Sequence, residues 1–320
     1  MKHPSIIINI SLLAILAITG CKKNSIKPTD VYVAGISNGS AVYWKNNVAT
    51  TLGGLNSDAE KIVVSGNDVY VAGSITDVNG SKNAVYWKNG VVTNLGAGQG
   101  FGIAVQAADV YVVGAIPNNT NGSIATVWKN GIVTNLGSGQ INDIMISGND
   151  IYLAGNIITP QGTGIATYWK NNVPVNLGPG RTNAIAVAGT DVYVTGYSFA
   201  PAISAGYWKN GAFVNMGNGN DTEMHGITVS GNDVYISGVT SLLQGGYATY
   251  WKNGNATVLK DDGTNAFGIA VNGTDVYLSG LLFNLNRVGA DLYWKNSSAT
   301  TLASGPGAAY YAASVAVVSH

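Results

Sequence analysis

The strongest constraint on the fold of this chain is a repeat with a period close to 40 residues. The tetrad Asp-Val/Ile-Tyr-Val/Leu/Ile occurs seven times, beginning at Asp30, Asp68, Asp109, Asp150, Asp191, Asp233 and Asp275. Successive copies are 38 to 42 residues apart. That period is typical of a β-propeller, in which each repeat forms one blade of four antiparallel strands.

Each repeat contains signals for four strands and two tight turns. In one copy, β-rich runs occupy residues 227–229, 233–238, 248–252 and 256–259. Gly231-Asn232 separates the first two runs and favours a type II′ turn, and Asn253-Gly254 between the last two is a strong hairpin signal. The 43 glycines of the 320-residue chain suit many short strands joined by such turns.

The two ends of the chain indicate how the repeats close. The first repeat begins with its second strand at Asp30, and a spare first-strand sequence, Ser314–Val318, follows the last repeat. If this terminal strand completes the first repeat, the sheet edges that invite aggregation are covered. We therefore predict an all-β fold, a seven-bladed β-propeller of four-stranded antiparallel blades. It is formed by residues 30–320 and closed by the C-terminal strand joining the N-terminal blade.

The N-terminal segment has the features of a targeting signal. Lys2 and His3 precede an apolar run over residues 6–18, which is too short to span a bilayer comfortably. The run ends in Ile-Thr-Gly-Cys21, which resembles the bacterial lipobox, and Cys21 is the only cysteine. We predict a signal peptide over residues 1–20 and a short linker over residues 21–29. An ordinary signal peptide with an unrelated cysteine is the alternative.

The lipobox resemblance implies a location for the protein. It implies that Cys21 is acylated and becomes the new N-terminus, and several acyl chains together hold a protein stably in a membrane. Lys22 and Lys23 follow, with no acidic residue directly behind the cysteine. This favours the outer membrane over the inner membrane of the cell envelope.

The repeats resemble those of bacterial seven-bladed β-propeller repeat lipoproteins. The resemblance rests on Asp-Val-Tyr-Val-Thr-Gly at residues 191–196 and on the recurring Tyr-Trp-Lys-Asn-Gly, and it covers nearly the whole chain after Cys21. The chain departs from WD40 repeats, which have Asp after the third-strand Trp where this chain has Lys. It also lacks the repeat boxes of sialidases and of quinone-dependent dehydrogenases. Propellers carry many unrelated functions, so the resemblance implies a fold and not an activity.

All seven tryptophans lie in the repeated motif Trp-Lys-Asn, and two interpretations compete. Exposed indoles would stack on sugars at seven sites, whereas buried ones would hold the blades together. Both faces of a blade pack on neighbours, so we predict a structural role. The residues are Trp44, Trp87, Trp128, Trp169, Trp208, Trp251 and Trp294. We expect each following Lys to cover apolar surface with its stem, and each repeated Asp to accept local backbone N–H bonds.

Residues that usually carry chemistry are scarce. His225 is the only internal histidine, and no His or Cys pair has metal-ligand spacing, so we predict no metal site and no cofactor. The stretch around Asp261 has some features of a calcium loop without the full ligand series. The formal net charge is zero, which argues against nucleic acid as a partner. We expect a monomer.

A candidate site follows from how connections alternate between the two ends of a blade. Tight turns follow strands one and three at one end, and we expect longer, variable connections after strands two and four at the other. Residues just before each first strand should encircle the channel mouth there, where an unidentified protein, peptide or glycan would bind. They are Glu60, Phe101, Asn142, Asn183, His225, Phe267 and Ala313, with Lys61 and Asp143 beside them.

Three functions compete. The preferred one is a membrane-anchored cell-envelope lipoprotein, a non-enzymatic propeller scaffold that binds a ligand or a protein. The alternative is a glycan-binding propeller with equivalent Trp sites. The third is a polysaccharide lyase or hydrolase that uses a carboxylate pair, either Asp261 with Asp262 or Asp221 with Glu223. No catalytic set can be assembled from the sequence, so we predict that the protein is not an enzyme.

Overall fold

The structure is a computed structural model that describes residues 28–118, 122–241, 245–283, 288–306 and 310–320. These residues form 26 β-strands and no helix, which confirms the all-β class. Within this part of the chain there is consequently no helix that could span a membrane. The predicted signal peptide and Cys21 lie outside the described residues.

Hydrogen bonds join the strands into five antiparallel sheets, four of four strands and one of ten. The first sheet contains β26 (Tyr310–Ser319), β1 (Thr29–Ser37), β2 (Ser40–Lys45) and β3 (Val48–Leu55). The second contains β4 (Ser57–Ser65), β5 (Asp68–Thr76), β6 (Lys82–Lys88) and β7 (Val91–Ala97). Two further sheets contain β18 (Thr222–Ser230), β19 (Asp233–Thr240), β20 (Tyr247–Lys252) and β21 (Asn255–Asp262), and then β22 (Thr264–Asn272), β23 (Asp275–Phe283), β24 (Val288–Lys295) and β25 (Ser298–Pro306).

The ten-stranded sheet combines three repeats. It contains β8 (Gln99–Gln106), β9 (Asp109–Pro117), β10 (Ser123–Lys129), β11 (Ile132–Ser147), β12 (Asp150–Ile158), β13 (Gly164–Lys170), β14 (Val173–Ala188), β15 (Asp191–Ser198), β16 (Ser204–Lys209) and β17 (Ala212–Asn218). The first half of β11 pairs with β10 and its second half with β12, and β14 divides in the same way between β13 and β15.

This arrangement differs from the sequence prediction of seven separate sheets joined by long connections. In β11 and β14 the last strand of one repeat continues without a break as the first strand of the next. At the other junctions among the described residues, one to three residues separate the last strand of one repeat from the first strand of the next, as Asn56 does between β3 and β4. Extended backbone is enough to cross from the outside of one repeat to the inside of the next, so no turn is needed there.

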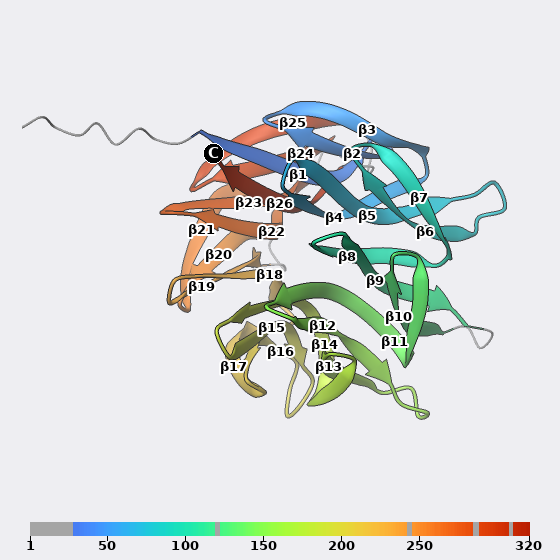
Figure 1. Cartoon of the computed structure of the whole chain (residues 1–320). Helices are drawn as coiled ribbons and strands as arrows, with labels where there is room; N and C mark the ends of the chain where they lie inside the picture. Colours follow the sequence, from blue (N-terminus) through green and yellow to red (C-terminus); the bar gives the residue numbers. More distant parts are fainter. Residues whose placement is uncertain (1–27, 119–121, 242–244, 284–287, 307–309) are drawn as a thin grey trace, which may run out of the picture.

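The two ends of the chain meet in one sheet. β26 pairs with β1 from Thr29 opposite Ser319 to Ser37 opposite Tyr310. Figure 1 shows this last strand, in dark red, beside the blue β1. The strand predicted at Ser314–Val318 is therefore present, and it takes the first-strand position of the first repeat. β26 also contacts β22 and β4, the corresponding strands of the last and second repeats.

The tryptophans lie in the core between repeats. The exposed fractions of all seven range from 0 to 4%. Six of them belong to buried clusters that each join two successive repeats, as Trp87 does with Ala34 and Ala59. A further cluster joins the last repeat to the first through Trp44 and Tyr277. Stacking on a sugar needs an exposed ring face, so the interpretation of the tryptophans as seven sugar sites is wrong.

A corner between strands two and three is the same in all seven repeats. In the second repeat, Asp68 Oδ2 lies 2.8 Å from Lys88 Nζ, and Asn89 Nδ2 donates to Asp68 Oδ1 over 2.7 Å. Asn89 Oδ1 accepts the backbone N–H of Val69, and the Lys88 ammonium lies 5.3 Å from the centroid of the Tyr70 ring. The other six corners have the same contacts, with Lys–Asp distances of 2.7 to 2.8 Å.

The corner corrects the role predicted for the repeated aspartates. Their carboxylates accept hydrogen bonds from Lys and Asn side chains across the hairpin, and it is the Asn that accepts a backbone N–H. The Lys and then the Asn hold the pKa of each carboxyl group below its ordinary value. The seven asparagines have φ between 49° and 56°, the left-handed conformation that the first residue of this hairpin turn requires.

Candidate functional site

A β-bulge interrupts the first strand of every repeat near the same end. These inner strands are β26, β4, β8, the second halves of β11 and β14, β18 and β22. At each bulge the pairing with the second strand skips one or two residues, and a bulge re-aims the side chains that it leaves unpaired. The skipped residues are Glu60, Phe101, Asn142, Asn183 with Ala184, His225 with Gly226, Phe267 and Ala313. They include all seven ring positions that the sequence predicts.

The last glycine of the repeated Asp-Val-Tyr-Val-x-Gly explains where the bulge forms. In the second repeat this is Gly73, where an added Cβ would collide with the carbonyl oxygen of Asp58 on the inner strand. Gly238 stands in the same relation to the carbonyl oxygen of Glu223. The second strand approaches the bulged strand so closely only because it has no side chain there. The same contact occurs at Gly35, Gly114, Gly155, Gly196 and Gly280.

The bulges bring their side chains around one cavity of about 250 Å³, here called the mouth cavity. All eight residues predicted for the site line it, namely Glu60, Lys61, Phe101, Asn142, Asp143, Asn183, His225 and Phe267. Ala313 lines it as well. Sequence reasoning missed Tyr311 of β26, which is also part of the lining and lies two residues before the ring position.

The ring residues lie within paired strands and not in the loops where the sequence placed them. β18 begins at Thr222, three residues before His225, although the sequence predicts a strand only from residue 227. The strand pairing continues beyond the bulge, where Thr222 pairs with Thr240. A site on paired strands is held more rigidly than one on loops.

Lys61 and Asp143 form an ion pair in the wall of the mouth cavity. Lys61 Nζ on β4 lies 3.0 Å from Asp143 Oδ1 on β11, and Asp143 Oδ2 accepts the backbone N–H of Ile185 on β14 over 3.1 Å. β8 packs between β4 and β11, and it has Gly102 where an added Cβ would crowd the Asp143 backbone. The ion pair therefore links inner strands and leaves neither charge without a partner.

Asn142 and Asn183 also link neighbouring inner strands. Asn142 Nδ2 donates to the carbonyl oxygen of Thr182 over 2.6 Å, and Asn183 Nδ2 donates to that of Met224 over 2.5 Å. The inner strands of neighbouring repeats do not pair with one another, so these amides supply hydrogen bonds between them. Two of the residues predicted to bind a ligand thus have a structural role.

Three rings from successive inner strands form one wall of the cavity. The ring centroids of His225 and Phe267 are 5.0 Å apart, and those of Phe267 and Tyr311 are 4.5 Å apart. The paired planes are inclined at 53° and 58°, so the wall is not a flat platform. His225 Nε2 also lies 3.4 Å from Glu223 Oε2, and this contact holds the pKa of Glu223 below its ordinary value.

Glu60 differs from the other charged residues of the cavity. Among the described residues it forms no hydrogen bond and no ion pair. Burial, together with the nearby Asp58 carboxylate, raises the pKa of Glu60 to about 7, against a weaker opposing effect of Lys82. Lys82 is itself paired with Asp58 at 2.9 Å. Burial and then the Glu60 carboxylate raise the pKa of Tyr311.

A second cavity of about 460 Å³ continues from the first along the inner strands. Lys61 and Asp143 line both cavities, as do Ile227, Ile269 and Val315. Beyond these residues the lining is mainly Ile, Val and Ala. Residues of all seven inner strands thus line a channel with mainly aliphatic side chains, whose mouth is a mixture of polar and aromatic ones.

The remaining predicted positions do not extend this site. In the described part of the chain, no group of three or more His, Cys, Asp or Glu side chains is arranged to hold a metal ion. Of the proposed carboxylate pairs, Glu223 faces His225, and the side chains of Asp261 and Asp262 lie outside the described residues. Lipidation of Cys21 stays a prediction for the same reason.

Comparison with known proteins places the fold among propellers. No protein-family model matches the sequence, and a search of the curated proteins finds no match either. The β-propeller domain of the trilobed protease from Pyrococcus furiosus shares 10% identity over 86% of this chain and 94% of its own, with a TM-score of 0.52. The fold is propeller-like. That domain is described as having an open velcro topology, whereas β26 of this chain pairs with β1.

Two larger peptidases match in the same way. The acylaminoacyl peptidase from Pyrococcus horikoshii is 12% identical over 87% of this chain, with a TM-score of 0.51. A prolyl endopeptidase is 10% identical over 85% of this chain, with a TM-score of 0.52. The chain spans about half the length of both, 51% and 49% respectively.

These matches contradict the function that the sequence predicted. A membrane-anchored, non-enzymatic lipoprotein scaffold was expected, whereas the three solved structures described above are peptidases or a peptidase propeller domain. The prediction rested on the targeting signal that ends at Cys21, which contains no information about what residues 30–320 bind. At such low identity the matches establish the fold alone, and they do not establish an activity for this chain.

Proposed function

We propose that this chain is the substrate-recognition propeller of a peptide-hydrolysing system. A peptide segment binds at the mouth cavity, and a separate catalytic polypeptide or domain carries out hydrolysis. The observation that carries the proposal is the ring of unlike side chains that the bulges hold at the entrance of an apolar channel. A peptide has both the polar backbone and the apolar side chains that such a mouth and channel accommodate. The likeness to peptidase propellers supports this substrate class at the level of fold.

The proposal includes a seven-bladed propeller closed between its two ends. Dividing β11 and β14 between neighbouring sets leaves seven antiparallel sets of four strands. Deleting residues 310–320 should therefore open the ring and lower the melting temperature by more than any single substitution. Deleting His320 alone removes only its 3.0 Å contact with Asp30 and its backbone bond to Pro28, and it is the matched control. An unchanged melting temperature after the longer deletion would contradict closure.

The peptide site can be tested by blocking the mouth chemically. In a Cys21→Ser background, Asn142→Cys places one thiol at the mouth cavity and Thr93→Cys places one on the exposed outer strand β7. Each protein is labelled with a bulky maleimide and incubated with a tryptic digest of casein. Retained peptides are then identified by mass spectrometry. We expect labelling at position 142 to abolish retention and labelling at position 93 to leave it intact.

Two results would overturn the proposal. Retention that survives the label at position 142 would place any peptide site away from the mouth. Failure of the unlabelled protein to retain any peptide would remove peptides as the ligand class. Circular dichroism of each labelled protein checks that the fold is intact.

The anchor at Cys21 is a separate proposal, which rests on the lipobox alone. We propose that an acylated Cys21 holds the chain at the cell envelope, in the outer membrane and not the inner one. Growth with an alkyne-tagged fatty acid should label the wild-type chain and not Cys21→Ser. Labelling of the variant would show that the lipid, if present, is attached elsewhere.

A further inference from the structure

We propose that the mouth cavity binds an alkylammonium group, with the Glu60 carboxylate as its counter-ion and the rings of Phe267 and Tyr311 as its wall. The inference rests on the proposed mouth site and names the part of a peptide that would occupy it. A lysine side chain, an N-methylated lysine or a free amino group has this chemistry.

The charges around the cavity leave Glu60 as the group that needs a cation. Lys61 on the same strand forms an ion pair with Asp143 of β11, and Lys82 of β6 forms one with Asp58. Across the mouth, His225 of β18 faces Glu223 of its own strand. Tyr311 of β26 is the remaining titratable group near Glu60. A ligand with a negative charge would meet the Glu60 carboxylate unscreened, whereas a cation would neutralise it.

The shape of the wall also suits a rounded cation. Phe267 and Tyr311 are inclined at 58° with centroids 4.5 Å apart, so they offer two inclined aromatic surfaces and not one flat platform. An ammonium within about 6 Å of an aromatic face is attracted by the ring quadrupole. The volume of about 250 Å³ holds a small head group and not a whole drug-sized ligand. A sugar ring stacks best on a flat platform, and a hard cation such as Ca²⁺ takes six to eight oxygen ligands, which a wall of two aromatic rings does not offer.

The titration of Glu60 gives the inference a pH signature. Because burial and Asp58 raise its pKa to about 7, the carboxyl group without ligand is protonated over much of the acidic range. A bound cation favours the charged form, so binding releases a proton below that pKa. Affinity should therefore increase as pH rises from 5 to 8 and level off above the pKa.

Choline and its uncharged isostere 3,3-dimethylbutan-1-ol are the probes. Both have the same shape, and only choline is a cation. Binding is measured by isothermal titration calorimetry at constant ionic strength. We expect choline to bind at least about tenfold more tightly than the alcohol at pH 8, which corresponds to about 1.4 kcal/mol. Equal affinities would overturn the inference.

Variants separate the counter-ion from the rings. Glu60→Gln should weaken choline binding about tenfold, remove its pH dependence and leave the alcohol unaffected. Asp77→Asn makes the same charge change on an exposed acid in the β5–β6 connection and should alter neither probe. Phe267→Leu should weaken choline more than the alcohol. Persistence of the pH dependence in His225→Gln would assign it to Glu60, and its loss there would contradict the inference.

The two proposals can fail separately. If casein peptides are retained at the mouth but choline does not bind, the peptide site stands and the ammonium inference is wrong. If choline binds with the expected selectivity but no peptide is retained, the ammonium site stands and the peptide function is wrong. Melting temperatures of the variants exclude misfolding as the cause of either result.

Discussion

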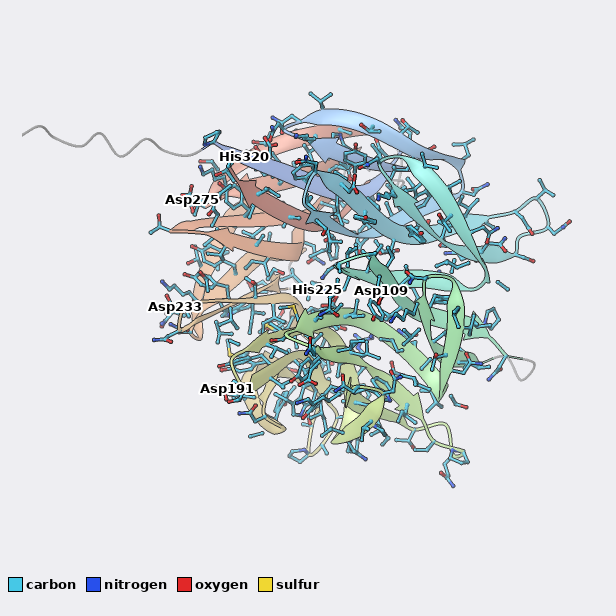
Figure 2. The ribbon with its side chains drawn as sticks, viewed as in Figure 1. Asp109, Asp191, His225, Asp233, Asp275 and His320 are labelled. Carbon is cyan, nitrogen blue, oxygen red and sulfur yellow. The ribbon has the colours of Figure 1, made fainter. Side chains whose placement is uncertain are left out.

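The seven corners and the seven ring positions lie toward opposite ends of the same four-stranded sets, yet they repeat differently. Every corner has the same Asp, Tyr, Lys and Asn in the same contacts, whereas the ring has Glu, two Phe, two Asn, His and Ala. Figure 2 labels four of the corner aspartates, of which Asp191, Asp233 and Asp275 lie along one edge of the view, and one ring residue, His225. Repetition therefore marks residues that build the scaffold, whereas the varied ring combines structural residues such as Asn142 with the side chains at which we propose a ligand binds.

A third set of positions breaks the repetition only once. On the third strand, one position pairs with the residue that follows the repeated glycine of the second strand. It is a fully buried alanine in six repeats, namely Ala41, Ala84, Ala125, Ala166, Ala205 and Ala248. In the last repeat it is Asp291, which is 0% exposed. Neither oxygen of Asp291 has an aligned hydrogen bond among the described residues, although the backbone N–H of Tyr311 favours its charged form.

Removing a repeated core residue should have the largest effect of a single substitution. Trp251 is 4% exposed and packs between two repeats. We expect Trp251→Ala to destabilise the protein by about 3–5 kcal/mol, because it leaves a cavity in that cluster. Urea unfolding measures the change. A variant as stable as the parent would contradict the scaffold role of the repeated motif.

The repeated glycine beside the bulge should come next. Gly73→Ala places a Cβ against the carbonyl oxygen of Asp58, and we expect a loss of about 1–3 kcal/mol from overpacking. Gly54→Ala on β3 meets no atom within 4 Å and is the matched control. Thermal unfolding of both variants checks the prediction. Equal melting temperatures would show that the bulge does not depend on this glycine.

Asp291 should make the stability of the protein depend on pH. Burial raises the pKa of Asp291 to about 8, above its ordinary value of 3.8, so the folded state keeps a proton that the unfolded state has lost. Stability from this group therefore falls as pH rises from about 4 to 8, at up to about 1.4 kcal/mol per pH unit. We therefore expect the stability of Asp291→Ala relative to the parent to be clearly greater at pH 9 than at pH 4. Urea unfolding that changes equally at both pH values would contradict this.

A single corner should matter least. Lys88→Met keeps the apolar stem and removes the exposed ion pair with Asp68. Exposed ion pairs contribute little to stability, so the melting temperature should hardly change. A large drop would mean that the corners act as a cooperative network and not as seven separate contacts.

Much of the fold could be predicted because it repeats. The tetrads, the turns and the spare strand at Ser314–Val318 each predict a local structure that the described residues contain. The corner contacts were missed because Asp68 and Lys88 are 20 residues apart and meet only through strand register. The five-sheet pattern was missed because no sequence signal distinguishes the continuous β11 from a broken connection.

The positions of the ring residues could be predicted from the sequence, but the bulges that hold them could not. Spacing places Glu60 and His225 before each predicted strand, whereas the bulge that holds them depends on the pairing of two strands. Tyr311 and the isolation of Glu60 depend on which inner strands are neighbours in space. The predicted function was wrong because the lipobox at Cys21 predicts where the protein is located and contains no information about what it binds.

The most direct test of the central claim is to map where a ligand binds. Casein peptides that the chain retains are titrated into isotopically labelled protein, and backbone amide shifts are followed by NMR. The account predicts shifts concentrated at the seven bulges, around Glu60, Phe101, Asn142, Asn183, His225, Phe267 and Ala313. Shifts concentrated at the repeated Asn-Gly corners would contradict it.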